Sequence, residues 1–211
     1  GSTGRGNYGH GLDVAWKNIS GAEIVAVADD NSRGRESALK RLNCKKGYED
    51  YREMLKVEKP DFISICPRHV DQRVPMIEAA CECGVTRVSL GSQSLNQQTL
   101  AALDRDHQPD DVRRAVKRLL GAGLTVSVDL LIAAPGQTLN GVKADLEATI
   151  ALGCQHVSVY CLTWEPGTDF FRRRQRGLLQ AVPEGLERAM FEEAIHCLER
   201  AGYRQYEVSN F

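Results

Sequence analysis

The sequence alternates between short stretches rich in β-branched residues and longer stretches with apolar residues at helical spacing. Strand-like stretches at 87–90, 125–132 and 156–162 are each followed by a polar loop and then by a helix-like stretch. Strands that alternate with helices form parallel sheets, because each helix carries the chain back across a face of the sheet. The sequence therefore predicts an α/β fold, with a mostly parallel sheet flanked by helices.

The same pattern extends over most of the chain. We expect further strands at 23–28 and 61–66, and helices at 32–42, 51–57, 74–83, 97–103, 111–120, 141–152 and 183–201. The last helix is amphipathic, with Leu186, Met190, Ala194 and Leu198 on one face. Parallel strands gather their carboxyl ends at one edge of a sheet, where α/β proteins place ligands.

Composition narrows the classes of function. The 27 Lys and Arg residues against 28 Asp and Glu residues give a net charge of -1, so we expect neither nucleic acid nor an anionic membrane as a partner. No apolar run approaches the roughly 20 residues that span a bilayer, and we expect a cytoplasmic protein.

The seven cysteines and five histidines show no spacing typical of metal ligands. Cys81 and Cys83 would point to different sides of a helix. We predict no metal site.

The N-terminal glycines fit the dinucleotide pattern G-x-G-x-x-G at Gly4, Gly6 and Gly9. Only three residues precede them, so we expect the strand that normally delivers this loop to be absent. Asp29 ends the strand-like stretch 23–28 about 20 residues beyond Gly9, the separation at which a carboxylate meets the ribose of a dinucleotide. The alternative is that Asp29 caps the following helix, with Ser32 as a rival cap.

These residues carry a resemblance. The segments GSTGRGNYGHGLD, EIVAVADD, YEDYREML and KPDFISICPRH resemble the glucose–fructose oxidoreductase/inositol dehydrogenase (Gfo/Idh/MocA) family over residues 1–83. The resemblance implies a truncated Rossmann segment that binds NAD(P), with Gly4, Gly6 and Gly9 at the pyrophosphate, Asp29 at the adenosine ribose and Pro67 beside the nicotinamide.

The chain departs from this family after Gly84. The family's next strand carries a Glu-Lys-Pro motif whose lysine serves catalysis, whereas this chain continues Arg-Val-Ser-Leu. Hydride transfer would therefore need another proton donor, for which Lys40, Lys45 and His69 are the nearby candidates.

Polar residues accompany the predicted strands of the second part of the chain. Gln93, Asp129 and Thr163 lie at or near the carboxyl ends of three strands, and Arg105 follows the first loop and helix. Asp129 interrupts the apolar run Val-Ser-Val-Asp-Leu-Leu, where a carboxylate needs a partner. That partner is either a ligand or an ion pair or cap that holds the loop.

A second resemblance covers residues 84–211. The segments RVSLGSQSLNQQTLAALDRDH, VSVDLLIAAPGQT, HVSVYCLTWEPGT and GYRQYEVSNF resemble the oxygen-independent coproporphyrinogen III oxidase-like radical SAM family, nearest its haem-chaperone (HemW-like) branch. It implies a partial (β/α) barrel in which Gln93, Arg105 and Asp129 contact S-adenosylmethionine and Thr163 lines the same pocket. The family's Cys-x3-Cys-x2-Cys motif is absent from this sequence, so we expect no [4Fe–4S] cluster and no radical chemistry.

Together the resemblances predict a chimera of a Rossmann segment, 1–83, and a barrel segment, 84–211, which form separate segments or one continuous domain. In the continuous form the strand at 87–90 extends the sheet. We expect residual binding of a small-molecule nucleotide, either NAD(P) or S-adenosylmethionine, and no complete catalytic site. The alternatives are an NAD(P)-dependent oxidoreductase and a radical SAM haem-chaperone-like protein. An exposed apolar edge at 23–28 would favour association between copies.

Overall fold

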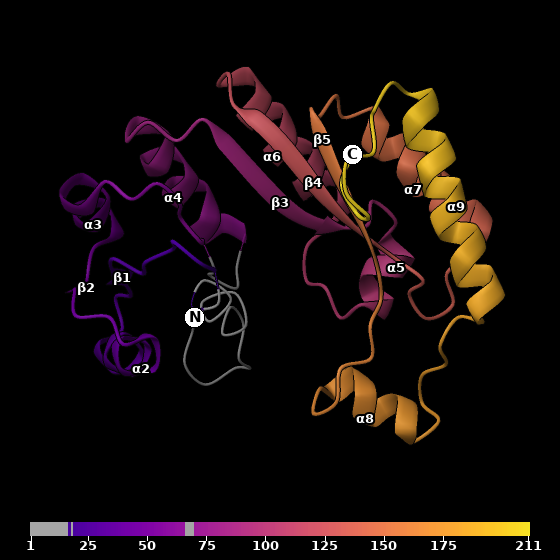
Figure 1. The fold of residues 1–211 in the computed structure, drawn as a ribbon, viewed down its shortest axis with the longest axis horizontal. Coiled ribbons are helices and arrows are strands. Elements are labelled where there is room, and N and C mark those ends of the chain that lie inside the picture. Colours follow the sequence, from indigo (N-terminus) through magenta and orange to yellow (C-terminus); the bar gives the residue numbers. More distant parts are fainter. Residues whose placement is uncertain (1–16, 18, 66–69) are drawn as a thin grey trace. The chain divides into compact units, whose positions relative to one another are not determined.

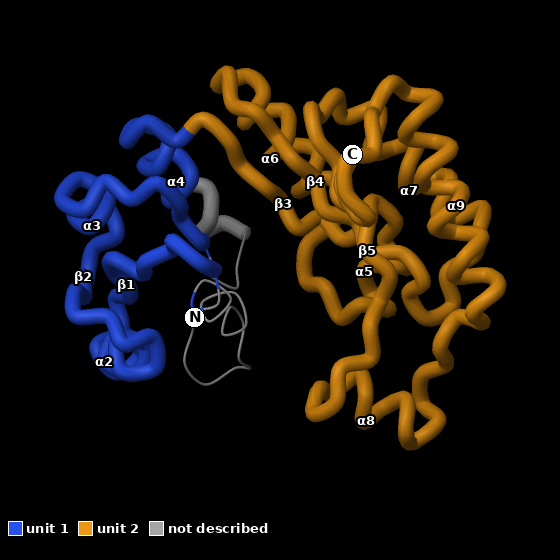
Figure 2. The backbone as a smooth tube through the Cα atoms, in the orientation of Figure 1, with its two compact units in different colours: residues 1–85 blue, residues 86–211 orange. Residues whose placement is uncertain are grey.

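The computed structural model describes residue 17 and residues 19–65 and 70–211. The chain forms two compact units, residues 1–85 and 86–211, which Figure 2 shows in different colours. Each unit has its own sheet among the described strands, and each is described here by itself. No helix in the described ranges is both long enough and apolar enough to cross a membrane.

The first unit has a two-stranded parallel sheet surrounded by helices. Its elements are β1 (Val27–Ala28), α2 (Ser32–Leu42), β2 (Gly47–Tyr48), α3 (Tyr51–Glu58) and α4 (Val70–Glu82). The α2 helix begins after Asn31, whose side chain accepts a hydrogen bond from the Gly34 N–H at 2.8 Å. A small core of Leu55, Ala79 and Ala80 packs between α3 and α4.

The strands of the first unit are shorter than the sequence predicts. Of the expected strand at 23–28, only the two residues of β1 pair, and their partner is the unexpected strand β2. Residues 61–65 form no strand, and Phe62 is 74% exposed instead of lying in a sheet. Among the described residues, the sheet of this unit consists of β1 and β2, so a Rossmann sheet is not seen there.

The second unit contains a three-stranded parallel sheet in the order β3-β4-β5 (Figure 1). Its elements are β3 (Arg87–Gln93), α5 (Gln97–Ala102), α6 (Pro109–Gly121), β4 (Thr125–Ile132), α7 (Leu139–Ile150), β5 (His156–Cys161), α8 (Asp169–Gln175) and α9 (Glu184–Arg200). The parallel pairing of strands that alternate with helices confirms the parallel α/β prediction for this part of the chain. The short helix α8 was not predicted.

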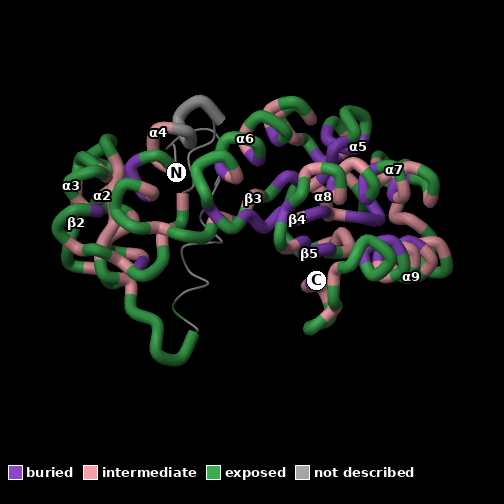
Figure 3. The backbone as a smooth tube through the Cα atoms, turned by 90° about the horizontal axis from the view of Figure 1, so that it is seen from above, coloured by how far each residue is buried: buried purple, intermediate pink, exposed green. Residues whose placement is uncertain are grey.

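The three strands present one apolar and one polar face. On β4, Val126, Val128, Leu130 and Ile132 are each at most 2% exposed, and they alternate with Ser127 and Asp129. Figure 3 shows buried positions along β4 and β5. Met190, Ala194 and Leu198 of α9 are fully buried, as their spacing predicts, whereas Leu186 is half-buried.

The register aligns the polar residues of neighbouring strands. Ser89, Ser127 and His156 lie side by side across the sheet, and Gly91, Asp129 and Ser158 form the next row. Because alternate residues of a strand point to the same side, these side chains share one surface. We call this surface the polar face; its members are Ser89, Ser127, Asp129, His156 and Ser158.

The two edges of the sheet differ. Residues 209–211 run antiparallel to β5, where Val157 and Phe211 exchange two backbone hydrogen bonds of 3.2 and 2.9 Å. Among the strands that the structure describes, β3 pairs only with β4. The prediction that the strand at 87–90 extends a sheet from the first part of the chain is therefore not seen, and β3 belongs to the sheet of the second unit.

Candidate functional site

The end of β3 brings a glutamine amide onto the sheet. Gln93 has a φ of 65°, which is unusual for a residue with a side chain. Its amide folds back over Gly91, because a Cβ at residue 91 would lie only 2.8 Å from Gln93 Nε2. Gly91 in turn pairs with Asp129 on β4. The lack of a side chain at residue 91 thus places the Gln93 amide in the same row of the sheet as the Asp129 carboxylate.

Asp129 is held by hydroxyls from both neighbouring strands. Ser89 Oγ lies 3.1 and 3.2 Å from the two carboxylate oxygens, and Ser158 provides a second hydrogen bond. Burial raises the pKa of Asp129 above its ordinary value, although the serine hydrogen bonds oppose that shift. Asp129 lies within β4 rather than at its end. None of the ion pairs between described residues includes Asp129, so the ion-pair alternative is not seen.

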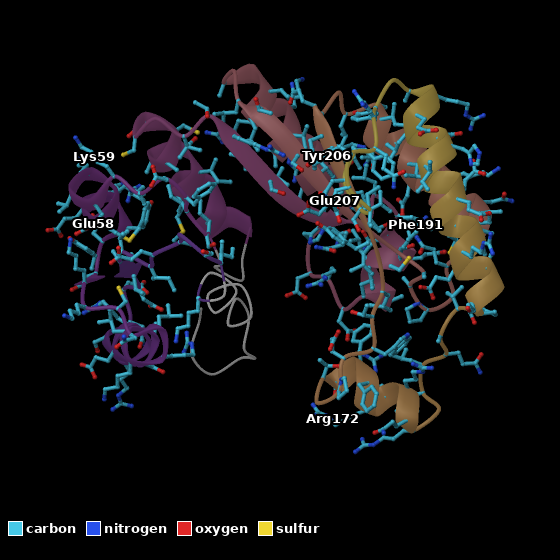
Figure 4. The ribbon with its side chains drawn as sticks, in the orientation of Figure 1. Glu58, Lys59, Arg172, Phe191, Tyr206 and Glu207 are labelled. Atoms are coloured by element: carbon cyan, nitrogen blue, oxygen red, sulfur yellow. The ribbon has the colours of Figure 1, made fainter. Side chains whose placement is uncertain are left out.

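A histidine extends the polar face towards the C-terminal segment. His156 Nδ1 lies 2.7 Å from Ser127 Oγ, and His156 Nε2 lies 2.7 Å from the Tyr206 hydroxyl. Burial and the nearby positive charge of Arg87 lower the pKa of His156. Ser158 Oγ also lies 3.0 Å from Asn210 Oδ1, so residues 206–210 contact the polar face at two points. Figure 4 labels Tyr206 and Glu207 beside the sheet.

The loops at the carboxyl end of the sheet hold buried polar atoms without partners. Arg105 Nε, Ser92 Oγ and Gln137 Nε2 make no hydrogen bond to any described residue. Arg105 follows α5, Ser92 is the last residue but one of β3, and Gln137 lies in the loop between β4 and α7. Buried polar atoms are almost always hydrogen-bonded, so each of these exceptions is a candidate contact for a polar ligand.

Asp145 fixes the loop after β3 and was missed by the sequence analysis. This carboxylate is 5% exposed and accepts hydrogen bonds from the Leu95 N–H at 2.8 Å and from Ser94 Oγ. Burial raises the pKa of Asp145. The signal in the sequence was an acid on the apolar side of the predicted helix at 141–152, one turn from Val142 and Thr149.

The positions of the other predicted site residues say less about ligand binding. Thr163 is exposed, two residues beyond the end of β5. The Asp29 carboxylate accepts a hydrogen bond from the Asn31 N–H at 2.9 Å, which is a turn contact, while Asn31 is the cap of α2. Asn31 rather than Asp29 or Ser32 therefore caps α2, and the ribose contact of Asp29 stays a prediction. Gly4, Gly6, Gly9 and Pro67 lie outside the described residues.

The thiols of this chain do not fit an iron–sulfur cluster. The sequence contains no Cys-x3-Cys-x2-Cys, and the described residues contain no group of three candidate metal ligands. Burial raises the pKa values of Cys154 and Cys161 to about 11, which disfavours the thiolate form that metals bind.

Comparisons with known proteins support the second resemblance, that of residues 84–211 to the radical SAM family. The chain is 36% identical over 160 residues to a haem chaperone, HemW, from Lactococcus lactis, covering 75% of this chain and 42% of that protein. It is 40% identical over 139 residues to the mitochondrial radical S-adenosyl methionine domain-containing protein 1 of Mus musculus, covering 65% of this chain and 31% of that protein. The chain thus spans less than half the length of these relatives.

A solved structure shows the same fold. Coproporphyrinogen III oxidase from Escherichia coli, described as a radical SAM enzyme, superposes with a TM-score of 0.62 and 16% identity over 80% of this chain and 42% of that chain. None of these findings supports a Gfo/Idh/MocA segment, NAD(P) binding or a chimera. The profile of the radical SAM superfamily matches residues 37–149, which crosses the expected junction at 83–84 and covers over half of the chain. The chain belongs to the radical SAM superfamily.

Proposed function

We propose that residues 86–211 bind S-adenosylmethionine and form part of a radical SAM protein of the HemW-like, haem-chaperone type. The observation that carries the proposal is the placement of the Gln93 amide over Gly91, in one row of the sheet with the half-buried Asp129 carboxylate. The pair lies on the polar face of the sheet, and the buried Arg105 Nε, in the segment after α5, has no hydrogen-bond partner among the described residues.

The chemistry of these side chains suits the polar groups of S-adenosylmethionine. The Asp129 carboxylate can accept hydrogen bonds from ribose hydroxyls or from the ligand's ammonium group. The Arg105 guanidinium can donate to the methionyl carboxylate, and the Gln93 amide can both donate and accept. Thr163 offers a hydroxyl beyond the end of β5. The cluster that drives radical chemistry in this superfamily has no ligands in this chain, so the proposal is limited to binding.

The haem part of the proposal comes from the relatives. Several of them are named haem chaperones, and this chain spans 42% or less of the two relatives described above. We infer that the chain supplies the nucleotide-binding part of such a protein, with a haem-type porphyrin as the cargo of the whole. This accords with the alternative drawn from the sequence and replaces the chimera as the main interpretation.

Calorimetry with S-adenosylmethionine tests the proposal. We expect binding by the unaltered chain, and a loss of about tenfold or more in Asp129→Asn, because a charged hydrogen-bond acceptor is removed without a change of shape. Gly91→Ala should give a similar loss, since the new methyl group displaces the Gln93 amide.

Asp110→Asn is the matched control, because the Asp110 side chain is 76% exposed on α6. It should bind as the unaltered chain does. If NAD(H) binds and S-adenosylmethionine does not, the proposal is wrong and the dinucleotide interpretation returns.

A further inference from the structure

The hydroxyl of Ser158 lies between two hydrogen-bond acceptors. Ser158 is a buried residue of β5, and it pairs directly with Asp129 of β4 in the register of the sheet. It forms a hydrogen bond with the Asp129 carboxylate, and its Oγ lies 3.0 Å from Asn210 Oδ1 in the segment that runs along the other side of β5. A serine hydroxyl has one proton to donate. Ser158 can therefore donate to Asp129 or to Asn210, and not fully to both.

The orientation of the Asn210 amide is fixed by Glu207, which Figure 4 labels beside the sheet. Asn210 Nδ2 donates to Glu207 Oε2 at 2.5 Å, and the Ser209 N–H donates to the same oxygen at 3.1 Å. Because the amide nitrogen is engaged there, the amide oxygen of Asn210 faces Ser158. The backbone anchors this segment to β5, since the Val159 N–H donates to Ser209 O at 2.8 Å. Asn210 is thus a fixed acceptor for the Ser158 proton.

The protonation state of Asp129 decides where the Ser158 proton goes. A protonated Asp129 can donate to Ser158 Oγ, which leaves the serine proton for Asn210, so each of these groups has a partner. An ionised Asp129 has no proton to donate and competes with Asn210 for the serine proton. One of these two half-buried acceptors then loses a hydrogen bond, which costs free energy. Ser89, at 3.1 Å, can donate to Asp129 in both states.

Other titratable and charged groups surround Asp129. They are His156 on β5, Arg87 at the start of β3, and Tyr206 and Glu207 in the C-terminal segment. A positive charge on His156 favours the ionised form of Asp129, whereas burial and Arg87 lower the pKa of His156. The titration of His156 is therefore the effect that a test on Asp129 has to separate.

We propose that Ser158 and Asn210 are positioning residues of the Asp129 site, and that they link ligand binding at Asp129 to the loss of its proton. S-adenosylmethionine carries a positive sulfonium and a positive ammonium group, which favour an ionised carboxylate. Binding then turns the Ser158 hydroxyl from Asn210 towards Asp129, so Asn210 opposes binding at acidic pH. This inference rests on the proposed function and adds the regulation of the same site by pH.

Carbon-13 NMR of the full chain, labelled at the aspartate carboxyl carbons, follows the protonation of Asp129 without any ligand. The Asp129 signal is the one that Asp129→Asn lacks. We expect Ser158→Ala to raise the midpoint of its titration by about half a pH unit or more, because the carboxylate loses a donor. Asn210→Leu should lower the midpoint by a similar amount, because the serine proton then belongs to Asp129 alone. A merely structural role would move both midpoints in the same direction.

Ser209→Ala is the matched control from the same segment. The Ser209 hydroxyl makes no hydrogen bond to any described residue, so this variant should leave the midpoint unchanged. The opposite shifts should persist when His156→Gln is added to each variant, because the neighbouring titration is then absent. Shifts of the same sign in Ser158→Ala and Asn210→Leu, or opposite shifts that vanish with His156, would overturn the proposal.

Calorimetry with S-adenosylmethionine at a series of pH values tests the link to the ligand. The affinity should rise with pH. Below the midpoint, Asn210→Leu should bind about threefold more tightly than the unaltered chain, and Ser158→Ala about threefold more weakly, as a shift of half a pH unit implies. Binding that does not change with pH would overturn this inference and leave the proposed function intact. Opposite shifts in the NMR titration without any binding would overturn the proposed function and keep the positioning roles.

Discussion

The Asp129 carboxylate is partly buried, which costs folding free energy, and its orientation is fixed, as is often true of ligand-binding carboxylates. Hydroxyls from Ser89 and Ser158, on the strands to either side, hold its oxygens in the row that contains Gly91. Burial raises the pKa of Asp129, which means that the charged form is disfavoured in the folded protein. The charge is therefore retained at the expense of stability and is available to a ligand.

The raised pKa predicts the pH dependence of an Asp129→Asn variant. The folded state holds the Asp129 proton to a higher pH than the unfolded state does, so protonation of Asp129 stabilises the fold. This stabilisation is fully present below the pKa of the unfolded state, and it is lost as the pH rises through the pKa of the folded state. At pH 7 we expect Asp129→Asn to be more stable than the unaltered chain, by up to about 1 kcal/mol. This gain should disappear below about pH 4, the ordinary pKa of an aspartate.

Urea unfolding at a series of pH values measures this effect. Asp110→Asn is the control, because the exposed Asp110 should leave the curve unchanged. An Asp129→Asn variant that is less stable at pH 7 would show that the carboxylate stabilises the fold, and that its role is structural.

Some of the candidate site was predictable from residues and some was not. An aspartate inside an apolar strand drew attention to Asp129, and the end of a strand drew attention to Gln93. Their meeting through Gly91 depends on a left-handed φ at Gln93, which no pattern in a single sequence reveals. Ser89 and Ser158 were also missed, because the register between strands is not readable from their separate sequences.

Among the elements, the loop after β3 depends most on one distant residue. Asp145 of α7 accepts hydrogen bonds from the backbone of Leu95 and the hydroxyl of Ser94, 50 and 51 positions earlier in the chain. The loop carries Gln93 at its start, so its conformation sets the position of the site. A second contact, 2.9 Å between His107 Nε2 and Ser92 O, holds the same loop.

We therefore predict that Asp145→Ala destabilises the second unit by about 2–4 kcal/mol, because it leaves the buried Leu95 N–H without its partner and removes the charged acceptor of the Ser94 hydroxyl. Asp145→Asn should lose much less, since its amide can still accept from Leu95 and donate to Ser94. Thermal unfolding of the two variants provides the comparison. Equal loss in both would show that the negative charge, rather than the hydrogen bonds, holds the loop.

The elements that the sequence predicted well are those with a clear period and a clear end. The helix at 32–42 and the strand at 125–132 match α2 and β4 to the residue. The α8 helix was missed because none of its residues is buried, so it has no apolar face to produce a period. The strand expected at 61–66 is not formed by residues 61–65, and Phe62 is exposed there.

At the scale of the whole molecule, the chain divides at 85–86, but the superfamily match does not. The radical SAM profile begins at residue 37, inside the first unit, and ends at 149, inside the second. The resemblance of residues 1–83 to a dehydrogenase rested on a glycine loop and strand-like runs, of which the described structure keeps only the two-residue β1. Short runs of this kind occur in many α/β proteins, whereas the second resemblance included a continuous segment of 21 residues, RVSLGSQSLNQQTLAALDRDH.

The division predicts how the parts behave when separated. The candidate site residues lie in residues 86–211, together with the core of β4, β5 and α9; they are Gln93, Arg105, Asp129 and Thr163. We expect a fragment of residues 86–211 to unfold cooperatively on heating. It should bind S-adenosylmethionine with an affinity within about threefold of that of the full chain, because a threefold difference corresponds to less free energy than one lost hydrogen bond. Among the described strands β3 pairs only with β4, and the charge of the exposed Arg87 at its start disfavours association of the fragment through this edge. Circular dichroism and calorimetry on both proteins make the comparison. A fragment that folds and has lost its affinity would show that residues 1–85 contribute to the site, and a fragment that does not fold would show that the two units depend on each other for stability.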